Sequence, residues 1–369
     1  MRYNFDKVID RSGTSAEKVE GLKHIWGRTD LIPLWVADMD FATAPFVTDA
    51  IRKRCENEVL GYTGKPDSYY NAIINWVKQR YDLVVAKEMI NFVPGIVPGI
   101  GMAMNCFTQK GDKVMIQPPV YHPFAWVTTR NERTLVTNPL KWENGMYRMD
   151  LDTFREQIKG CKLFILCNPH NPGGVVWTEA ELRAIADICY DEKVLVFSDE
   201  IHADLTLPPH THRPFATVSE KARMNSVTFM SPSKAFNMPG LSASHALIFN
   251  EDLRKRFRIY MDAGELDMGH VFAFLSVEAA YSHGTEWLDQ CLAYIQGNID
   301  FVDDFLKNHA PKIKAIRPEA SYLVWLDCRE LKLSQKDLNE FFVDKAHLAL
   351  NDGEMFGKEG KIGRASCRE

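Results

Sequence analysis

The chain has 369 residues, a length that suggests two domains, and 46% of them are hydrophobic and 25% charged, as in an ordinary globular protein. Its 44 basic and 49 acidic residues leave a net charge of −5, which supplies no basic field for binding a phosphate backbone. These values argue against disordered, collagen-like and coiled-coil classes and against a nucleic acid as partner.

The N-terminal residues 1–28 contain no apolar core of a secretion signal, and the chain has no apolar run of about 18 residues. Its eight cysteines are spread thinly, without a CxxC pair, which is typical of small buried side chains in a reducing compartment. We therefore expect a cytoplasmic protein that neither spans nor binds a membrane.

The central part of the chain predicts alternating strands and helices. Glycine and proline punctuate residues 91–107, which predicts a loop opening into a helix, and the apolar stretch 113–119 predicts a strand. Residues 162–199 then predict a strand, a helix and a second strand, the βαβ unit of a parallel sheet. Thr178 and Glu181 form a capping box at the start of the predicted helix.

Further strands are predicted at 226–234 and 244–250, so we expect an α/β fold with helices on both faces of a mostly parallel sheet. The apolar segment 321–327 and the helical pattern over 334–346 suggest a smaller α+β unit. We place the large domain at 45–285. The small domain combines residues 1–44 and 286–369.

Three polar residues follow predicted strands of this sheet, where ligands bind in open α/β folds. Asn171 follows the first strand of the βαβ unit, Asp199 ends the second, and Lys234 comes after the strand that begins at Ser226. Taken singly, they are typical of a turn former, a helix cap and a surface lysine. Their joint placement instead indicates one site.

An amine, a carboxylate and an amide at one site suit pyridoxal 5′-phosphate, which needs a Schiff-base lysine, a partner for its ring nitrogen and a donor to its ring oxygen. Ser231, Ser233 and the backbone of the loop 95–101 can donate hydrogen bonds to a phosphate. Tyr121 can stack on a flat ring, although an aromatic residue beside prolines is more often simple packing.

Several motifs make the resemblance specific. NPHNPGG (168–174), SDEIHADL (198–205) and SPSKAFNMPGL (231–241) resemble fold-type I pyridoxal-phosphate enzymes of aminotransferase class I/II. PLWVADMDF (33–41), PGIVPGI (94–100), PPVYHPF (118–124) and LNDGEMFG (350–357) resemble the MalY/PatB branch of cystathionine β-lyases, also called C–S lyases. The similarity covers nearly the whole chain.

The resemblance implies a role for each matching residue. Lys234 would bind the cofactor covalently, Asp199 would pair with its pyridine nitrogen, and Asn171 would contact its 3′-oxygen. Tyr121 would stack on the ring. The phosphate would be held by Ser231, Ser233, the backbone at Ile96 and Val97, and Tyr62 of the neighbouring subunit of a homodimer. His202, which is also expected to bind the cofactor, stands where many aminotransferases carry a tyrosine. Ser242 stands where aspartate aminotransferases carry an arginine, and both departures favour the lyase branch.

The implied activity is a carbon–sulfur β-lyase that cleaves L-cystathionine, or substrates of the L-cysteine type, to pyruvate, ammonia and a thiol. An aminotransferase is the nearest alternative, since it shares the steps up to loss of the α-proton. A protein of another class, which binds a transcription activator as a MalY-type member does, is a further alternative. His210 and His212 could suggest a metal site, but two histidines without further ligands are usually solvated, and we expect no metal.

The C-terminal end departs from the family. In the family, an Arg-Leu-Asn motif follows shortly after LNDGxxFG, and its arginine holds the substrate carboxylate. This chain instead continues as GKEGKIGRASCRE. Residues 362–369 read like the translation of a sequencing-library adapter, so we expect a truncated gene product. Arg364 precedes Ala-Ser and does not match the motif. We therefore expect a complete cofactor site and weakened substrate binding.

Overall fold

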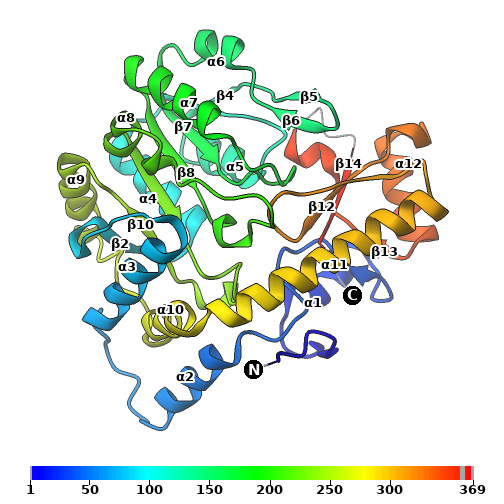
Figure 1. Ribbon diagram of the computed structural model, residues 1–369, viewed down its shortest axis with the longest axis horizontal. Coiled ribbons are helices and arrows are strands. Elements are labelled where there is room, and N and C mark those ends of the chain that lie inside the picture. The colour runs from blue at the N-terminus through cyan, green and yellow to red at the C-terminus, as the bar shows by residue number, and fades with distance from the viewer. Residues whose placement is uncertain (1, 358–361, 367–369) are drawn as a thin grey trace.

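The structure, a computed structural model, describes residues 2–357 and the backbone of residues 362–366. Its centre is a seven-stranded sheet in the order β2-β10-β9-β8-β7-β3-β4 (Figure 1). Strand β10 runs antiparallel to both of its neighbours, and the other neighbouring pairs are parallel. The predicted α/β fold with a mostly parallel sheet is therefore confirmed. The strands are β2 (Ile90–Val93), β3 (Lys113–Ile116), β4 (Thr134–Thr137), β7 (Cys161–Cys167), β8 (Leu195–Asp199), β9 (Ser226–Met230) and β10 (Ser244–Leu247).

Side chains of β7 alternate between two hydrophobic clusters, one on each face of the sheet. Leu163 and Ile165 belong to a cluster with residues of α4, and Phe164 and Leu166 belong to a cluster with residues of α7. Both faces are thus covered by helices, as the near-continuous apolar strands require. The helices near the sheet are α4 (Ile96–Phe107), α5 (Pro123–Arg130), α6 (Leu151–Gln157), α7 (Glu179–Asp191), α8 (Glu220–Met224) and α9 (Glu251–Asp262).

The βαβ unit predicted over 162–199 is confirmed as β7, α7 and β8. Its capping box is present, because Thr178 Oγ1 accepts from Glu181 N at 3.2 Å and Glu181 Oε2 accepts from Thr178 N at 2.8 Å. The strands predicted around 113–119, 226–234, 244–250 and 321–327 are also present. Strand β2 was not predicted, because three of its four residues fall in the segment 91–107 that was interpreted as a loop and because it pairs only with the distant β10.

A third cluster contains residues of α2 (Pro45–Cys55), α3 (Asp67–Tyr81), α10 (Val271–His283) and the long α11 (Thr285–His309). Two short sheets join parts of the chain that are distant in sequence. In one, β1 (Ile32–Pro33) pairs with β13 (Leu348–Ala349); the other contains β11 (Lys314–Ile316), β12 (Leu323–Asp327) and β14 (Ile362–Ser366). The remaining α-helices and strands of the described residues are α1 (Glu17–Trp26), α12 (Gln335–Glu340) and the hairpin β5 (Lys141–Glu143) with β6 (Met146–Arg148).

The pairing of β1 with β13 joins the N-terminal arm to the C-terminal part, as the small-domain hypothesis requires, but the domain boundaries stay a prediction. Strand β14 lies within the segment interpreted as foreign sequence, and that interpretation also stays a prediction. Residues 367–369 lie outside the described part of the chain. Within the described residues, no helix has both the length and the apolar character needed to cross a bilayer.

Candidate active site

A cavity of about 220 Å³ lies where β7, β8 and β9 end. These strands are adjacent and parallel, with Cys167 beside Asp199 and Asp199 beside Phe229 in register. Their carboxyl ends therefore meet at one edge of the sheet, where the following loops turn into the cavity. Eight of the ten predicted site residues line it: Ile96, Val97, Tyr121, Asn171, Asp199, His202, Ser233 and Lys234.

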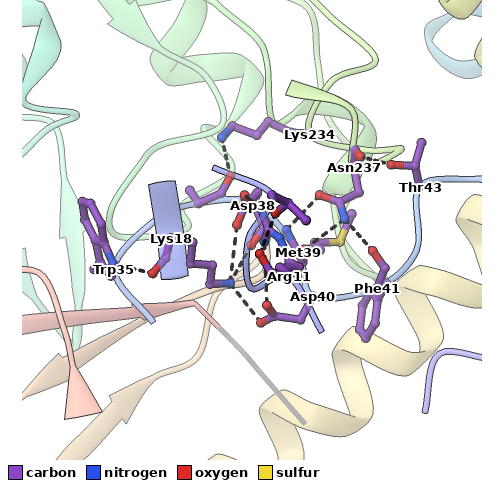
Figure 2. Close-up of polar contacts among 12 residues, drawn as sticks. Arg11, Lys18, Trp35, Asp38, Met39, Asp40, Phe41, Thr43, Lys234 and Asn237 are labelled. Carbon is purple, nitrogen blue, oxygen red and sulfur yellow. Dashed lines mark hydrogen bonds and ion pairs between the residues drawn. The ribbon is translucent and has the colours of Figure 1, made fainter. Parts of the chain in front are cut away.

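Lys234 lies in the turn that follows β9. Its Nζ donates a hydrogen bond to the backbone oxygen of Ala37, which belongs to the N-terminal arm (Figure 2). Ala37 also lines the cavity. The position of Ala37 beside Lys234 was not predicted. Ala37 lies in the family motif PLWVADMDF, but nothing in that motif indicates a contact with a lysine 197 positions away.

Asp199 lines the cavity and is buried, and its Oδ1 accepts from the backbone N–H of Ile201 at 3.1 Å. Burial raises the pKa of this carboxyl to about 7; the nearby charge of Glu200 adds to the rise, whereas the Ile201 hydrogen bond and the charge of Lys234 oppose it. The site therefore disfavours an isolated anion. A cationic group in the cavity would stabilise the ionised form.

A raised pKa has a definite effect on stability. Below about pH 4 Asp199 is protonated whether the chain is folded or unfolded, and between about pH 4 and 7 only the folded chain keeps the proton. Its contribution to stability is therefore lost as the pH rises through this window. We expect Asp199→Asn to be more stable than wild type above pH 7 by up to about 4 kcal/mol in the cofactor-free protein. Urea unfolding at several pH values measures the difference, and equal pH dependence in the two proteins would contradict it.

Two hydroxyls and a helix terminus form the part of the site suited to an anion. Ser231 and Ser233 are buried, with their Oγ atoms 2.9 Å apart, and Ser231 Oγ is also 2.9 Å from Ala243 O. Ile96 and Val97 begin α4, where backbone N–H groups have no acceptor within the helix. Ser231 itself is not a lining residue and contacts the cavity through Ser233.

Tyr62 lies apart from this cavity in the same subunit. It is 98% exposed, in the segment between α2 and α3, and Val59 and Leu60 beside it are also exposed. Such a row of exposed apolar side chains is typical of a surface that another chain covers. The predicted contact with the neighbouring subunit's site stays a prediction.

The two histidines of the HTH segment differ in their surroundings. His210 is exposed, whereas the interpretation of His212 as solvated was wrong: it is buried, and its Nε2 lies 2.8 Å from Glu200 Oε2. Glu200 Oε1 accepts from Ser198 Oγ and from Phe215 N, both at 2.8 Å. His212 thus holds the carboxylate next to Asp199. Among the described residues, no group of three or more potential metal ligands occurs.

Ser242 also lines the cavity, as do Ser244 and Cys167, and none of the three was predicted to bind the cofactor. None of the described lining residues is an arginine. The expectation of a weakened hold on the substrate carboxylate therefore stays a prediction.

The family model described as aminotransferase class I and II matches residues 29–368. The chain belongs to this family. It is 38% identical to cystathionine beta-lyase PatB of Bacillus subtilis (strain 168) over 97% of this chain and 93% of that protein.

Two solved structures are similar to this chain over nearly its whole length. Cystalysin from Treponema denticola, which contains a pyridoxal 5′-phosphate cofactor, superposes with a TM-score of 0.96 at 33% identity, covering 100% of this chain and 94% of that one. The PLP-bound C–S lyase from Staphylococcus hominis superposes with a TM-score of 0.91 at 35% identity, covering 99% and 94%. The predicted family is therefore confirmed, and so is its fold type.

Proposed function

We propose that this protein is a pyridoxal-phosphate-dependent carbon–sulfur β-lyase that cleaves L-cystathionine or a related sulfur amino acid. The single observation that carries the proposal is the convergence of Lys234, Asp199 and Asn171 on one cavity at the ends of three adjacent parallel strands. The relatives support the same activity, because the one at 38% identity is named a cystathionine β-lyase and a structural neighbour is named a C–S lyase.

The side chains present fit the cofactor. Asp199 is a buried carboxyl whose ionisation is disfavoured without a counter-charge, and a protonated pyridine nitrogen supplies one. Asn171 can donate to the ring oxygen, and Tyr121 can cover one ring face. Ser233, Ser231 and the first amides of α4 would hold the phosphate, and Lys234 would hold the aldehyde through its amine.

Bound pyridoxal phosphate supplies an electron sink for the charge left when a proton leaves the substrate α-carbon. Asp199 would keep the ring nitrogen protonated. Lys234, once the substrate amine has taken its place, would remove the α-proton as the general base. With a thiolate on the β-carbon, the overall reaction converts L-cystathionine and water to homocysteine, pyruvate and ammonia.

The decisive experiment is incubation of the purified protein with pyridoxal phosphate and L-cystathionine in the absence of any keto acid. A lyase releases pyruvate and a thiol in equal amounts under these conditions. An aminotransferase would release neither in catalytic amounts and would turn over only after a keto-acid acceptor is added. A protein that only binds a regulator would turn over in neither case.

The proposal includes a homodimer in which Tyr62 completes the phosphate site of the neighbouring subunit. Its support is the nearly full exposure of Tyr62 together with the exposed Val59 and Leu60. When each variant is prepared alone, we expect Tyr62→Ala to be weakly active and Lys234→Ala to be inactive. Co-refolding them in equal amounts should restore up to about a quarter of wild-type activity, because a mixed dimer then has one intact site. No gain on mixing would contradict a shared site.

A cytoplasmic location is also part of the proposal. The seven cysteines of the described residues form no disulfide, and five of them are buried. This use of cysteine suits a reducing compartment.

A further inference from the structure

An irregular segment, residues 37–43, passes beside Lys234 without forming a helix or a strand. Its backbone polar groups are bonded by side chains from other parts of the chain instead of by a neighbouring strand (Figure 2). Met39 and Phe41 of this segment are buried, and their backbone groups need such partners, because unpaired backbone groups away from water are costly. Its position therefore depends on a few side chains.

Asn237 supplies most of these partners. Its Oδ1 accepts from Met39 N at 3.0 Å, and its Nδ2 donates to Met39 O at 2.9 Å and to Phe41 O at 2.6 Å. The backbone oxygen of Asn237 accepts from Thr43 Oγ1 at 2.6 Å. The carboxamide thus pairs with Met39 as a peptide group of an adjacent strand would. Its φ of 52° is one that asparagine adopts more readily than most residues.

A second set of contacts holds the same segment from α1 and the N-terminal arm. The Lys18 side chain is only 1% exposed, and its Nζ donates to Asp38 O and to Asp40 Oδ2, both at 2.9 Å. Arg11 donates to Asp38 Oδ2 at 2.7 Å. A shift of the segment would therefore break the bonds from Lys18 and Arg11 as well as those from Asn237.

The held segment includes Ala37, whose backbone oxygen contacts the reactive lysine. This oxygen accepts from Lys234 Nζ and also from Tyr322 OH at 2.9 Å. Asn237 lies three residues after Lys234, in the same turn. The turn that carries the lysine therefore also carries the side chain that bonds Met39 and Phe41, two and four residues after the lysine's acceptor.

We propose that Asn237 is a positioning residue for Lys234: its carboxamide sets the register of residues 37–43, so that the Ala37 oxygen receives the lysine amine whenever that amine is not joined to the cofactor. This proposal rests on the proposed function, in which Lys234 alternates between holding the cofactor and removing the substrate proton. Asn237 is not among the residues that line the cavity. It acts on Lys234 through the backbone of residues 37–43.

The test compares Asn237→Ala with Asn225→Ala. Asn225 is a matched control, because it is also partly buried and its Nδ2 donates to a backbone oxygen, Val194 O at 2.7 Å, while it does not line the cavity. With L-cystathionine as substrate, we expect Asn237→Ala to lower kcat about 10- to 100-fold with little change in KM, since a misplaced base slows proton removal without removing a binding group. The isotope effect on kcat with α-deuterated substrate should rise.

A second readout needs neither cofactor nor turnover. In the cofactor-free protein, we expect trinitrobenzenesulfonate to label Lys234 several-fold faster in Asn237→Ala than in wild type, as measured by mass spectrometry of the peptide that contains it. Asn237→Asp tests the same contact with a side chain of nearly the same size. It replaces the group that donates to Met39 O and Phe41 O by an oxygen that can only accept. It should be impaired at least as strongly.

Asn225→Ala should leave the isotope effect and the labelling rate at wild-type values. Equal losses of kcat in the two alanine variants, or wild-type kcat and labelling in both Asn237 variants, would overturn the proposal. If instead the wild-type protein released no pyruvate, the proposed function would fail, while the labelling experiment would still report whether Asn237 positions the lysine.

Discussion

Lys234→Ala is expected to abolish turnover, with kcat lower by about 10⁴-fold or more. The substitution removes both the amine that would hold the cofactor and the base that would remove the substrate proton, and no neighbouring side chain can supply both. The lysine side chain is hydrogen-bonded to Ala37 O but is not part of a hydrophobic cluster, so the fold should survive its loss.

Three measurements check this expectation. Pyruvate release should vanish, the visible absorbance of wild type with pyridoxal phosphate should be missing, and borohydride should no longer attach the cofactor to the peptide that contains position 234. Lys53→Ala, at an exposed position on α2, is the control and should behave as wild type. Retained turnover in Lys234→Ala would refute the assignment of the reactive amine.

Asp199→Asn is expected to lower kcat by about 10²- to 10³-fold while the protein remains folded. Asparagine has nearly the same shape, but it carries no negative charge to keep the pyridine nitrogen protonated, so the charge that develops on the substrate is less stabilised. The same substitution removes a carboxyl that is costly to ionise, because burial raises the pKa of Asp199 to about 7. Activity and stability should therefore move in opposite directions above pH 7, as at other sites where function opposes stability.

Steady-state kinetics of pyruvate release, with pyridoxal phosphate added, measure the first effect, and urea unfolding of the same two proteins in cofactor-free form measures the second. A variant that loses stability and activity together would indicate that Asp199 mainly supports the structure. Asp204→Asn provides the comparison, because Asp204 is also buried but accepts from Trp76 Nε1 at 3.0 Å and from Tyr81, away from the cavity. Burial raises the pKa of Asp204 as well, but both of its oxygens accept hydrogen bonds, and asparagine keeps only one acceptor oxygen, so Asp204→Asn should lower stability.

The sequence alone determined the βαβ unit over 162–199 and the placement of Asn171, Asp199 and Lys234 after the ends of three strands, two of this unit and the strand that begins at Ser226. Local signals carry this information: apolar runs predict buried strands, the capping box predicts the start of α7, and parallel strands necessarily end at the same edge of the sheet.

Only the tertiary structure decided what surrounds these residues. The contacts of Asn237 with Met39 span 198 positions, and those of Lys18 with Asp40 join a helix to a segment without regular structure. The burial of His212 against Glu200 was likewise not predicted. Side-chain hydrogen bonds to a distant backbone leave no periodic pattern in either segment, so they become visible only when packing brings the two together.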